Sequence, residues 1–351
     1  MHLPLTSPPQ WLCVAGPFQD VIVSTRCRLA RNIVGFPFTW RASELQLRDS
    51  TRQILDAATR SSDLLDRSRA LHRPDLSDTQ THALLDWRLV SKEWVDAGEH
   101  RWLIPDFAGH SSLTTQEEDH LRLQCILPGF QPNEARANVE QMEIALAATL
   151  PFSHSSTLGF LTTSLTNVGT GMRLSVLAHL PGLAAEGILP NAIHGARGMG
   201  CSVRGIFGEG SAAEGAFYQI SNAYTYGVSL EETVPRLLQV VRYLVAAERG
   251  ARNREFGKPE GERNLKDAVS ESLELLSRED ASPSRLLALV SVLRLGASQG
   301  VLAADLTDAS EWLAIAGAAG VAGGPGNIER SRFEAVRRTA SLRQVLRVLL
   351  K

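Results

Sequence analysis

The sequence predicts an α+β protein in which antiparallel strands mixed with helices are followed by an all-helical C-terminal domain. Apolar and polar residues alternate in several short segments before residue 256, as they do in half-buried strands. Residues 44–67 instead carry apolar positions at helical spacing. Beyond residue 256 only the helical spacing remains. We therefore expect one domain over residues 1–255 and a helical domain over residues 256–351.

The elements expected from these patterns follow one another along the chain. Alternation with a period of two predicts strands at residues 20–28, 120–127, 173–180 and 202–209. Helical spacing, interrupted by glycine and proline, predicts helices at residues 44–67, 265–276, 283–300, 308–317 and 332–350. A charged, glycine-containing stretch at residues 247–264 separates the two regions, and glycine-rich residues 316–327 are expected to connect flexibly to the last helix.

Composition excludes several classes of protein. The 351 residues are 44% hydrophobic and 21% charged, with a net charge of −2, so no overall field would attract nucleic acid or an anionic membrane. The four cysteines lack the CxxC spacing of zinc sites, and no signal sequence or run of about 18 apolar residues occurs. We expect a cytoplasmic protein whose anion sites, if any, are local.

The basic residues are almost all arginines. Only four of the 36 are lysines, which a GC-rich genome would also explain. The excess nevertheless argues against a Walker A loop and against a protein-kinase active site, because each needs a particular phosphate-binding lysine. No GxxxxGK[ST], HRD or DFG motif occurs.

Arginines stand at alternate positions of the expected strands. Alternation would place one set of side chains on one face of the first strand, Ile22, Ser24, Arg26 and Arg28, and the other set on the opposite face, Val21, Val23, Thr25 and Cys27. It likewise places Arg122 with Gln124, and Arg173 with Ser175. If these strands are neighbours, their guanidinium groups repel one another unless a multivalent anion such as a nucleoside triphosphate compensates them. The alternative is that each arginine pairs with a carboxylate or faces solvent.

Carboxylates accompany the arginines. Glu117 and Glu118 closely precede Arg122, and Glu209 follows Arg204 by five positions. Such runs are also common in solvated turns. A pair of carboxylates would hold a cationic guanidine in line with a γ-phosphate through its N–H groups, mainly by orienting it, because carboxylates are weak bases toward a guanidinium.

Four ordered blocks resemble the ATP:guanido phosphotransferases (phosphagen kinases), and most closely their bacterial protein-arginine kinase branch. "GPFQDVIVSTRCRLARNIVGFPF" is similar to the family's opening block and "QEEDHLRLQ" to its NEEDHLR block. "TNVGTGMRLSV" is similar to the end of its CPTNxGTxxRAS signature, and "VRGIFGEG" with the later "YQISN" to its RGxxGE loop. The resemblance covers almost the whole chain.

The resemblance implies the roles of individual residues. Glu118 and Glu209 match the catalytic carboxylates, the second on a loop that closes over substrate, and Ser164 and Asn167 fall in the substrate-binding signature. Arg31 is interpreted as structural. The residues matched to nucleotide binding are Ser24, Thr25, Arg26, Cys27, Arg28, Arg88, Arg122, Arg173, Leu174, Ser175, Val176, Leu177, Arg204, Gly205, Ile206, Phe207, Gly208 and Glu209.

The resemblance also implies a fold, cofactors and partners. The expected fold is a large antiparallel sheet flanked by helices, followed by a helical dimerisation domain. ATP would be the phosphoryl donor, with Mg²⁺ held mainly by its phosphates and little or no ligation by the protein. Protein substrates with exposed arginines, a homodimer, an activator protein and an ATP-dependent protease are the partners expected of this branch.

Departures from the family pattern leave alternatives open. Ser164 and Leu165 replace the family's Cys-Pro, and a serine hydroxyl does not ionise near neutral pH, so slower catalysis is expected. Ala212 replaces a carboxylate, Gln116 an asparagine and Arg88 a nucleotide-contacting histidine. The branch's phosphoarginine-binding RDxxRA motif is reduced to Arg338 in "EAVRRT" (residues 334–339), so we expect that regulation to be lost. The sequence thus favours a protein-arginine kinase, with a kinase of a small guanidino compound and a weakened nucleotide-binding regulator as alternatives.

Overall fold

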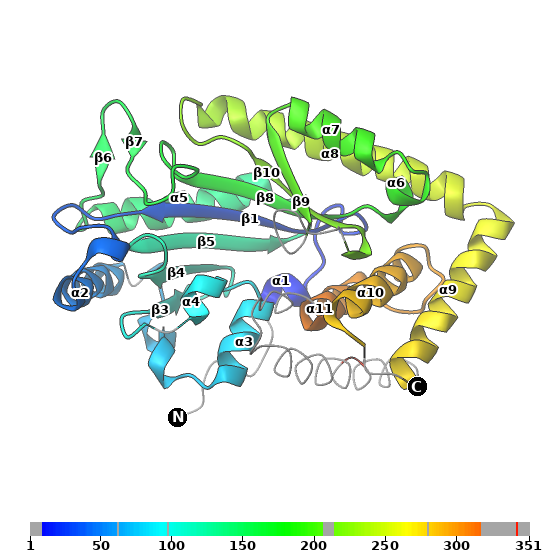
Figure 1. Cartoon of the computed structure of the whole chain (residues 1–351), viewed down its shortest axis with the longest axis horizontal. Helices are drawn as coiled ribbons and strands as arrows, with labels where there is room; N and C mark the ends of the chain where they lie inside the picture. The colour runs from blue at the N-terminus through cyan, green and yellow to red at the C-terminus, as the bar shows by residue number, and fades with distance from the viewer. Residues whose placement is uncertain are drawn as a thin grey trace.

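An eight-stranded antiparallel sheet forms the centre of the computed structural model, which describes residues 9–61, 63–96, 98–205, 214–278, 281–316 and 342 (Figure 1). The strand order is β2-β3-β4-β5-β1-β8-β10-β9, and every pairing is antiparallel. Its strands are β1 (Ile22–Arg31), β2 (Leu71–His72), β3 (Trp102–Pro105), β4 (Ser111–Thr115), β5 (Leu121–Pro128), β8 (Met172–His179), β9 (Cys201–Gly205) and β10 (Phe217–Asn222). A separate hairpin is formed by β6 (His154–Ser155) and β7 (Gly159–Phe160).

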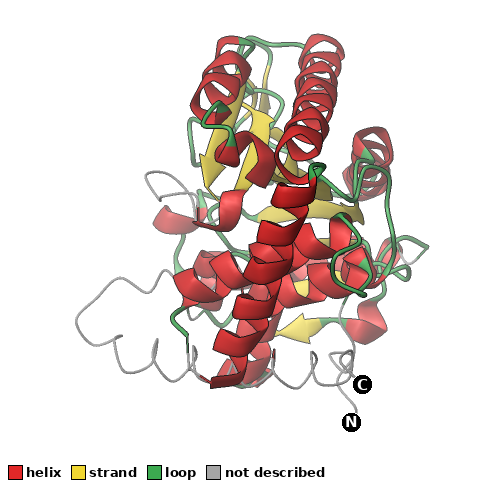
Figure 2. Ribbon diagram, turned by 90° about the vertical axis from the view of Figure 1, so that its right-hand side faces the viewer, coloured by secondary structure: helices red, strands yellow, loops and turns green. Residues whose placement is uncertain are grey.

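Helices flank the sheet on both sides (Figure 2). Those that precede residue 257 are α1 (Gln10–Cys13), α2 (Glu44–Arg60), α3 (Asp78–Asp86), α4 (Lys92–Val95), α5 (Pro132–Ala147), α6 (Pro181–Ala185), α7 (Leu189–Gly198) and α8 (Leu230–Phe256). The helical C-terminal part consists of α9 (Pro259–Arg278), α10 (Pro283–Ser298) and α11 (Leu306–Ala316). Short 3-10 turns lie at η1 (Thr39–Arg41), η2 (Arg67–Arg69), η3 (Arg73–Asp75) and η4 (Glu214–Ala216). No described helix contains a segment long and apolar enough to cross a membrane.

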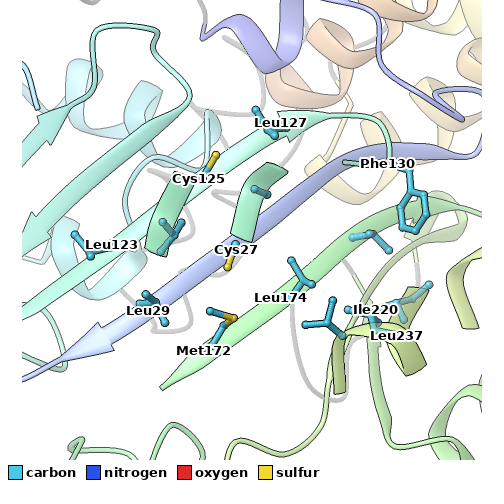
Figure 3. Close-up of a cluster of buried hydrophobic side chains, with 14 of the residues drawn as sticks. Cys27, Leu29, Leu123, Cys125, Leu127, Phe130, Met172, Leu174, Ile220 and Leu237 are labelled. Atoms are coloured by element: carbon cyan, nitrogen blue, oxygen red, sulfur yellow. The ribbon is translucent and has the colours of Figure 1, made fainter. Parts of the chain in front are cut away.

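One face of the sheet carries the larger hydrophobic core. Cys27 of β1 lies opposite Cys125 of β5 and Leu174 of β8, and all three are buried beneath α5 and α8 (Figure 3). A second core lies at one end of the sheet, where α1 and the C-terminal helices pack against Phe217 and Leu177. The C-terminal helices therefore share a core with the sheet.

The predicted fold class is confirmed, with corrections to individual elements. The helix expected at residues 44–67 ends at Arg60, and its start is fixed by a capping box between Ser43 and Gln46. The separating stretch at residues 247–264 is largely helical, with a break only at residues 257–258. Its polar sequence concealed a buried pair, Glu248 and Arg252. The connection at residues 316–327 and the helix expected at residues 332–350 lie outside the described residues except for Ala316 and Leu342.

The alternation predicted for the first strand fails at its start. A register shift between Ile22 and Ser24 marks a β-bulge, which inserts one extra residue and exchanges faces. Ile22, expected on the arginine face, is buried in the larger core, and Val23, expected opposite, packs in the second core. From Ser24 to Arg31 the alternation holds, with Arg26 and Arg28 half-buried between fully buried neighbours.

Candidate active site

The strand register brings five arginines onto one face of the sheet. Residues directly paired in an antiparallel ladder share a face. Arg28 is paired with Arg173 of β8 on one side and with Gln124 of β5 on the other. Arg122 precedes Gln124 by two positions, so its side chain lies on the same face. Arg204 joins this face through Gln219, which pairs with both Arg204 and Leu177. The five residues are Arg26, Arg28, Arg122, Arg173 and Arg204, collectively termed the arginine face.

Part of the positive charge on this face has no ion-pair partner among the described residues. Burial lowers the pKa of Arg26 well below its ordinary value, and the charges of neighbouring arginines lower it further. Burial, with Arg122 and Arg173, lowers the pKa of Arg28 to about 9, and burial lowers that of Arg88 to about 10. Arg28 Nε is buried without a hydrogen-bond partner, and no carboxylate of the described chain forms an ion pair with Arg26, Arg28 or Arg88. Clustered guanidinium groups of this kind favour a polyanion.

A narrow cavity on this face gathers side chains expected to bind nucleotide. Arg88 reaches it from the end of α3, where its φ of 59° is an unusual conformation for a residue other than glycine. The cavity is lined by Ser24, Arg26, Arg88, Ser175, Leu177 and Gln219, among others. Arg88 thus joins Arg28, Arg122 and Arg173 as an arginine whose charge acts on Arg26.

Other residues expected at the nucleotide site point elsewhere or are not described. Cys27, Leu174 and Val176 belong to the core of the opposite face, and the Thr25 hydroxyl donates to Gly129 O at 2.7 Å. The side chains of these four residues therefore face away from the arginines. Gly205 ends β9, whereas residues 206–213, with Ile206, Phe207, Gly208, Glu209 and Ala212, lie outside the described residues.

Glu118 is the exposed member of a rigid turn between β4 and β5. Gln116 N donates to His120 O across this turn. Asp119 is buried and accepts hydrogen bonds from Asn32 Nδ2 at 2.6 Å and Thr163 N at 2.7 Å. The His120 ring accepts from Ile33 N through Nδ1, so its Nε2 donates to Pro37 O. The buried neighbours therefore fix the position from which the Glu118 side chain emerges.

Glu118 lies between the arginine face and the turn that carries Ser164 and Asn167. Burial, Asp119 and Glu93 raise the pKa of Glu118, whereas Arg122 and a hydrogen bond from Ser164 lower it. Asn167 N donates to Ser164 O at 3.0 Å, which closes the turn that presents Ser164. A carboxylate is thereby brought close to Arg122 of the arginine face and to the serine that stands at the position of the family cysteine.

Sequence reasoning assigned no specific role to two residues of this region. Glu117 is buried and forms an ion pair with Arg122, while Ser91 and Thr114 donate to its two carboxylate oxygens. Gln219 lines the narrow cavity that contains Arg26 and Arg88. Alternation in "FYQISN" would have placed Gln219 on the same face as Ser221, but nothing in "QEED" separates a buried glutamate from an exposed one. Arg31, interpreted as structural, is buried against Glu143 at 2.6 Å and over the Phe160 ring.

Comparison with known proteins gives consistent matches. The family described as "ATP:guanido phosphotransferase, C-terminal catalytic domain" matches residues 50–251. The chain is 33% identical to the protein-arginine kinase of Halothermothrix orenii over 83% of each chain. It is 36% identical to that of Pelotomaculum thermopropionicum over 69% of this chain and 68% of the other.

Solved structures share the fold. The substrate-free duplicated taurocyamine kinase of Schistosoma mansoni superposes with a TM-score of 0.58 at 22% identity, covering 82% of this chain and 42% of that one. A lombricine kinase gives the same TM-score and identity, covering 72% of this chain and 73% of the other. At this identity the likeness concerns the fold alone.

Proposed function

The chain belongs to the ATP:guanido phosphotransferase family, and on that premise we propose that it is a protein-arginine kinase, which transfers the γ-phosphoryl group of ATP to arginine side chains of proteins. The observation that carries the proposal is the arginine face beside Glu118. It joins a cradle for a triphosphate to a carboxylate suited to a guanidinium. The protein substrate is inferred from the relatives named protein-arginine kinase.

The arginine face would hold the triphosphate. Guanidinium groups bind phosphate oxygens through paired N–H donors, and neither Arg26 nor Arg28 forms an ion pair with a carboxylate of the described chain. Arg26, Arg28, Arg122, Arg173 and Arg204 would take the phosphates, and Arg88 would stand beside the rest of the nucleotide. Magnesium, held mainly by the phosphates, would add charge neutralisation.

Glu118 would orient the acceptor. Its carboxylate accepts hydrogen bonds from the guanidinium of the target arginine and turns one nitrogen toward the γ-phosphorus, with Glu209 as second carboxylate and Ser164 and Asn167 contacting the acceptor. The nitrogen forms a bond to phosphorus while the bond to the β-phosphate oxygen breaks, and ADP leaves with that electron pair. The guanidinium loses one proton late in the step, to a carboxylate or to solvent.

Further parts of the proposal concern assembly. Residues 1–255 would form the catalytic domain, and residues 256–351 would join two copies into a cytoplasmic homodimer. An activator protein and an ATP-dependent protease would be partners of the enzyme. Sedimentation of the purified chain tests the dimer directly, since a monomer at working concentration would overturn that part alone.

Labelled ATP tests the proposed function. The pure protein is incubated with γ-labelled ATP and Mg²⁺, either with a denatured arginine-rich protein or with free arginine, and acid-labile phosphate is measured. We expect label on protein only. Label on free arginine alone would indicate a kinase of a small guanidino compound. Nucleotide binding without label on either acceptor would indicate a regulatory protein. Glu118→Gln should abolish the label while keeping nucleotide binding.

A further inference from the structure

A second cavity opens beside Glu118, away from the nucleotide cavity. Its volume is about 510 Å³, within the range of ordinary ligand sites. Its walls come from η1, α2, the segment before β3 and the turn that carries Glu118. Because Glu118 lines this cavity and also adjoins Ser164, the cavity continues directly from the proposed acceptor site.

Acidic side chains dominate the cavity wall. Its lining contains four glutamates, Glu44, Glu99, Glu117 and Glu118, and one arginine, Arg101. Glu117 is neutralised by Arg122, and the Arg101 guanidinium donates to the backbone carbonyls of Glu93, Asp96 and Gln116. Glu44 accepts a hydrogen bond from His100 Nε2 at 2.5 Å but stays largely exposed, and Glu99 is exposed too.

Gln116 adds a side-chain carbonyl oxygen that accepts no hydrogen bond from the described chain. Its Nε2 donates to Ser50 Oγ at 2.8 Å and to Thr51 Oγ1 at 3.0 Å. The Ser50 hydroxyl donates its own proton to Leu47 O at 3.0 Å, which places the amide nitrogen of Gln116 on the side of the two hydroxyls. Gln116 Oε1 therefore remains an acceptor, buried and without a hydrogen-bond partner, on a residue that is 5% exposed and lines the cavity.

Trp40 completes the wall with an aromatic ring. It is 68% exposed and lines the same cavity. An indole face attracts cations through its quadrupole, and the Arg41 guanidinium already lies 5.3 Å from the ring centroid. Carboxylates, an unused carbonyl oxygen and an exposed indole are together complementary to a long cationic side chain.

We infer that the acidic subsite, made by Trp40, Glu44, Glu99 and Gln116, binds a second basic side chain, lysine or arginine, that lies near the target arginine in the same protein substrate. This inference rests on the proposed function. It makes the enzyme selective for arginines in basic surroundings, because the second cation is held while Glu118 holds the first.

Peptide binding without nucleotide tests the inference, since no phosphoryl transfer occurs. Fluorescence anisotropy compares labelled peptides with one arginine and either lysine or norleucine at a neighbouring position. We expect the lysine peptide to bind about tenfold more tightly, which corresponds to one additional hydrogen bond to a charged group. The double variant Glu44→Gln with Glu99→Gln should lose this preference, whereas Glu134→Gln, an exposed glutamate on α5 against the other face of the sheet, should keep it.

A variant that leaves the net charge unchanged distinguishes a specific binding site from a general electrostatic attraction by the glutamates. Gln116→Met removes the unused acceptor but no charge, and it should also reduce the preference, with the ATP-induced rise in Tm as the check on folding. Equal affinity of the wild type for both peptides, or a preference lowered equally by Glu134→Gln, overturns the inference. The labelling assay decides the proposed function separately, so either can fail alone.

Discussion

Arg28 and Arg173 lie directly opposite each other on β1 and β8. Like charges at paired positions of a sheet destabilise it, and here both side chains are half-buried, which strengthens the repulsion. Arg26 and Arg122 add to the same field. The fold thus carries an electrostatic cost that a bound polyanion would remove.

ATP is therefore expected to stabilise the protein. Arg28→Met is expected to change both the stability without ATP and the affinity for ATP. At 100-fold excess over Kd, ATP should add about 2.7 kcal/mol to the free energy of unfolding. Arg28→Met removes the repulsion with Arg173, so the variant without ATP should melt above the wild type. It should also bind ATP about 10- to 100-fold more weakly, because one charge-assisted contact is lost. Thermal melts with and without ATP measure both effects.

The matched control is Arg242→Met, an exposed arginine on α8. It should keep the wild-type response to ATP. An Arg28→Met protein with an unchanged ATP response would contradict the assigned nucleotide site.

Nucleotide binding should be coupled to protonation above neutral pH. The pKa of Arg28 is about 9 in the free protein, and a bound triphosphate favours the charged form and raises it. Binding near pH 9 should therefore take up protons, and affinity should fall as pH rises further, while it stays constant near pH 7. Calorimetry in two buffers of different ionisation enthalpy gives the proton number, which Arg28→Met should reduce. Equal heats in both buffers would exclude this coupling.

Most of the arginine face was predictable because strand alternation is a local rule. The positions of Arg26, Arg28, Arg122 and Arg173 follow from it once the strands are neighbours. It failed at Ile22 and Val23, since a bulge depends on how the partner strand pairs and leaves no local signal.

Polar residues buried by tertiary contacts were beyond sequence reasoning. Glu248 and Arg252 look like a solvated linker, yet Glu248 accepts from Gly182 N and Leu183 N, and Arg252 donates to Asp20 O and His179 O. Their partners are more than 60 positions away, so no local pattern predicts them. Glu117 has partners nearer in sequence, Thr114 and Arg122, but nothing in the local pattern distinguishes it from the exposed Glu118.

Restoring the family cysteine should speed catalysis. Ser164 supplies a neutral hydrogen bond beside Glu118, whereas a thiolate would add a charge-assisted contact to the guanidinium. Ser164→Cys should raise kcat about tenfold, the effect of about 1.4 kcal/mol on the barrier. Ser270→Cys, which adds an exposed thiol on α9, should have no such effect in the same initial-rate assay. An unchanged kcat for Ser164→Cys would mean that residue 164 does not contact the reacting guanidinium.

Ser164→Ala should move the acid limb of the pH profile. Glu118 must be ionised to hold a guanidinium, and the Ser164 hydroxyl lowers its pKa against the raising effects of burial and Asp119. Without this hydroxyl the pKa rises, so activity is lost at a higher pH on acidification. The profile of kcat/KM in the acid range measures the shift. A lower rate with an unmoved limb would show that Ser164 does not interact with Glu118.

Glu117→Gln should make the thermal stability of the protein more dependent on bound ATP. Glu117 compensates Arg122 in the free protein, and breaking a buried ion pair costs about 3–5 kcal/mol, so the variant without ligand should melt lower. A bound triphosphate replaces the missing negative charge beside Arg122. The ATP-induced rise in Tm should therefore exceed that of the wild type, and thermal melts across an ATP titration measure the difference. Glu134→Gln should match the wild type throughout, whereas a Glu117→Gln protein with a lower Tm and a smaller ATP response would indicate that Glu117 orders the turn without balancing the charge of Arg122.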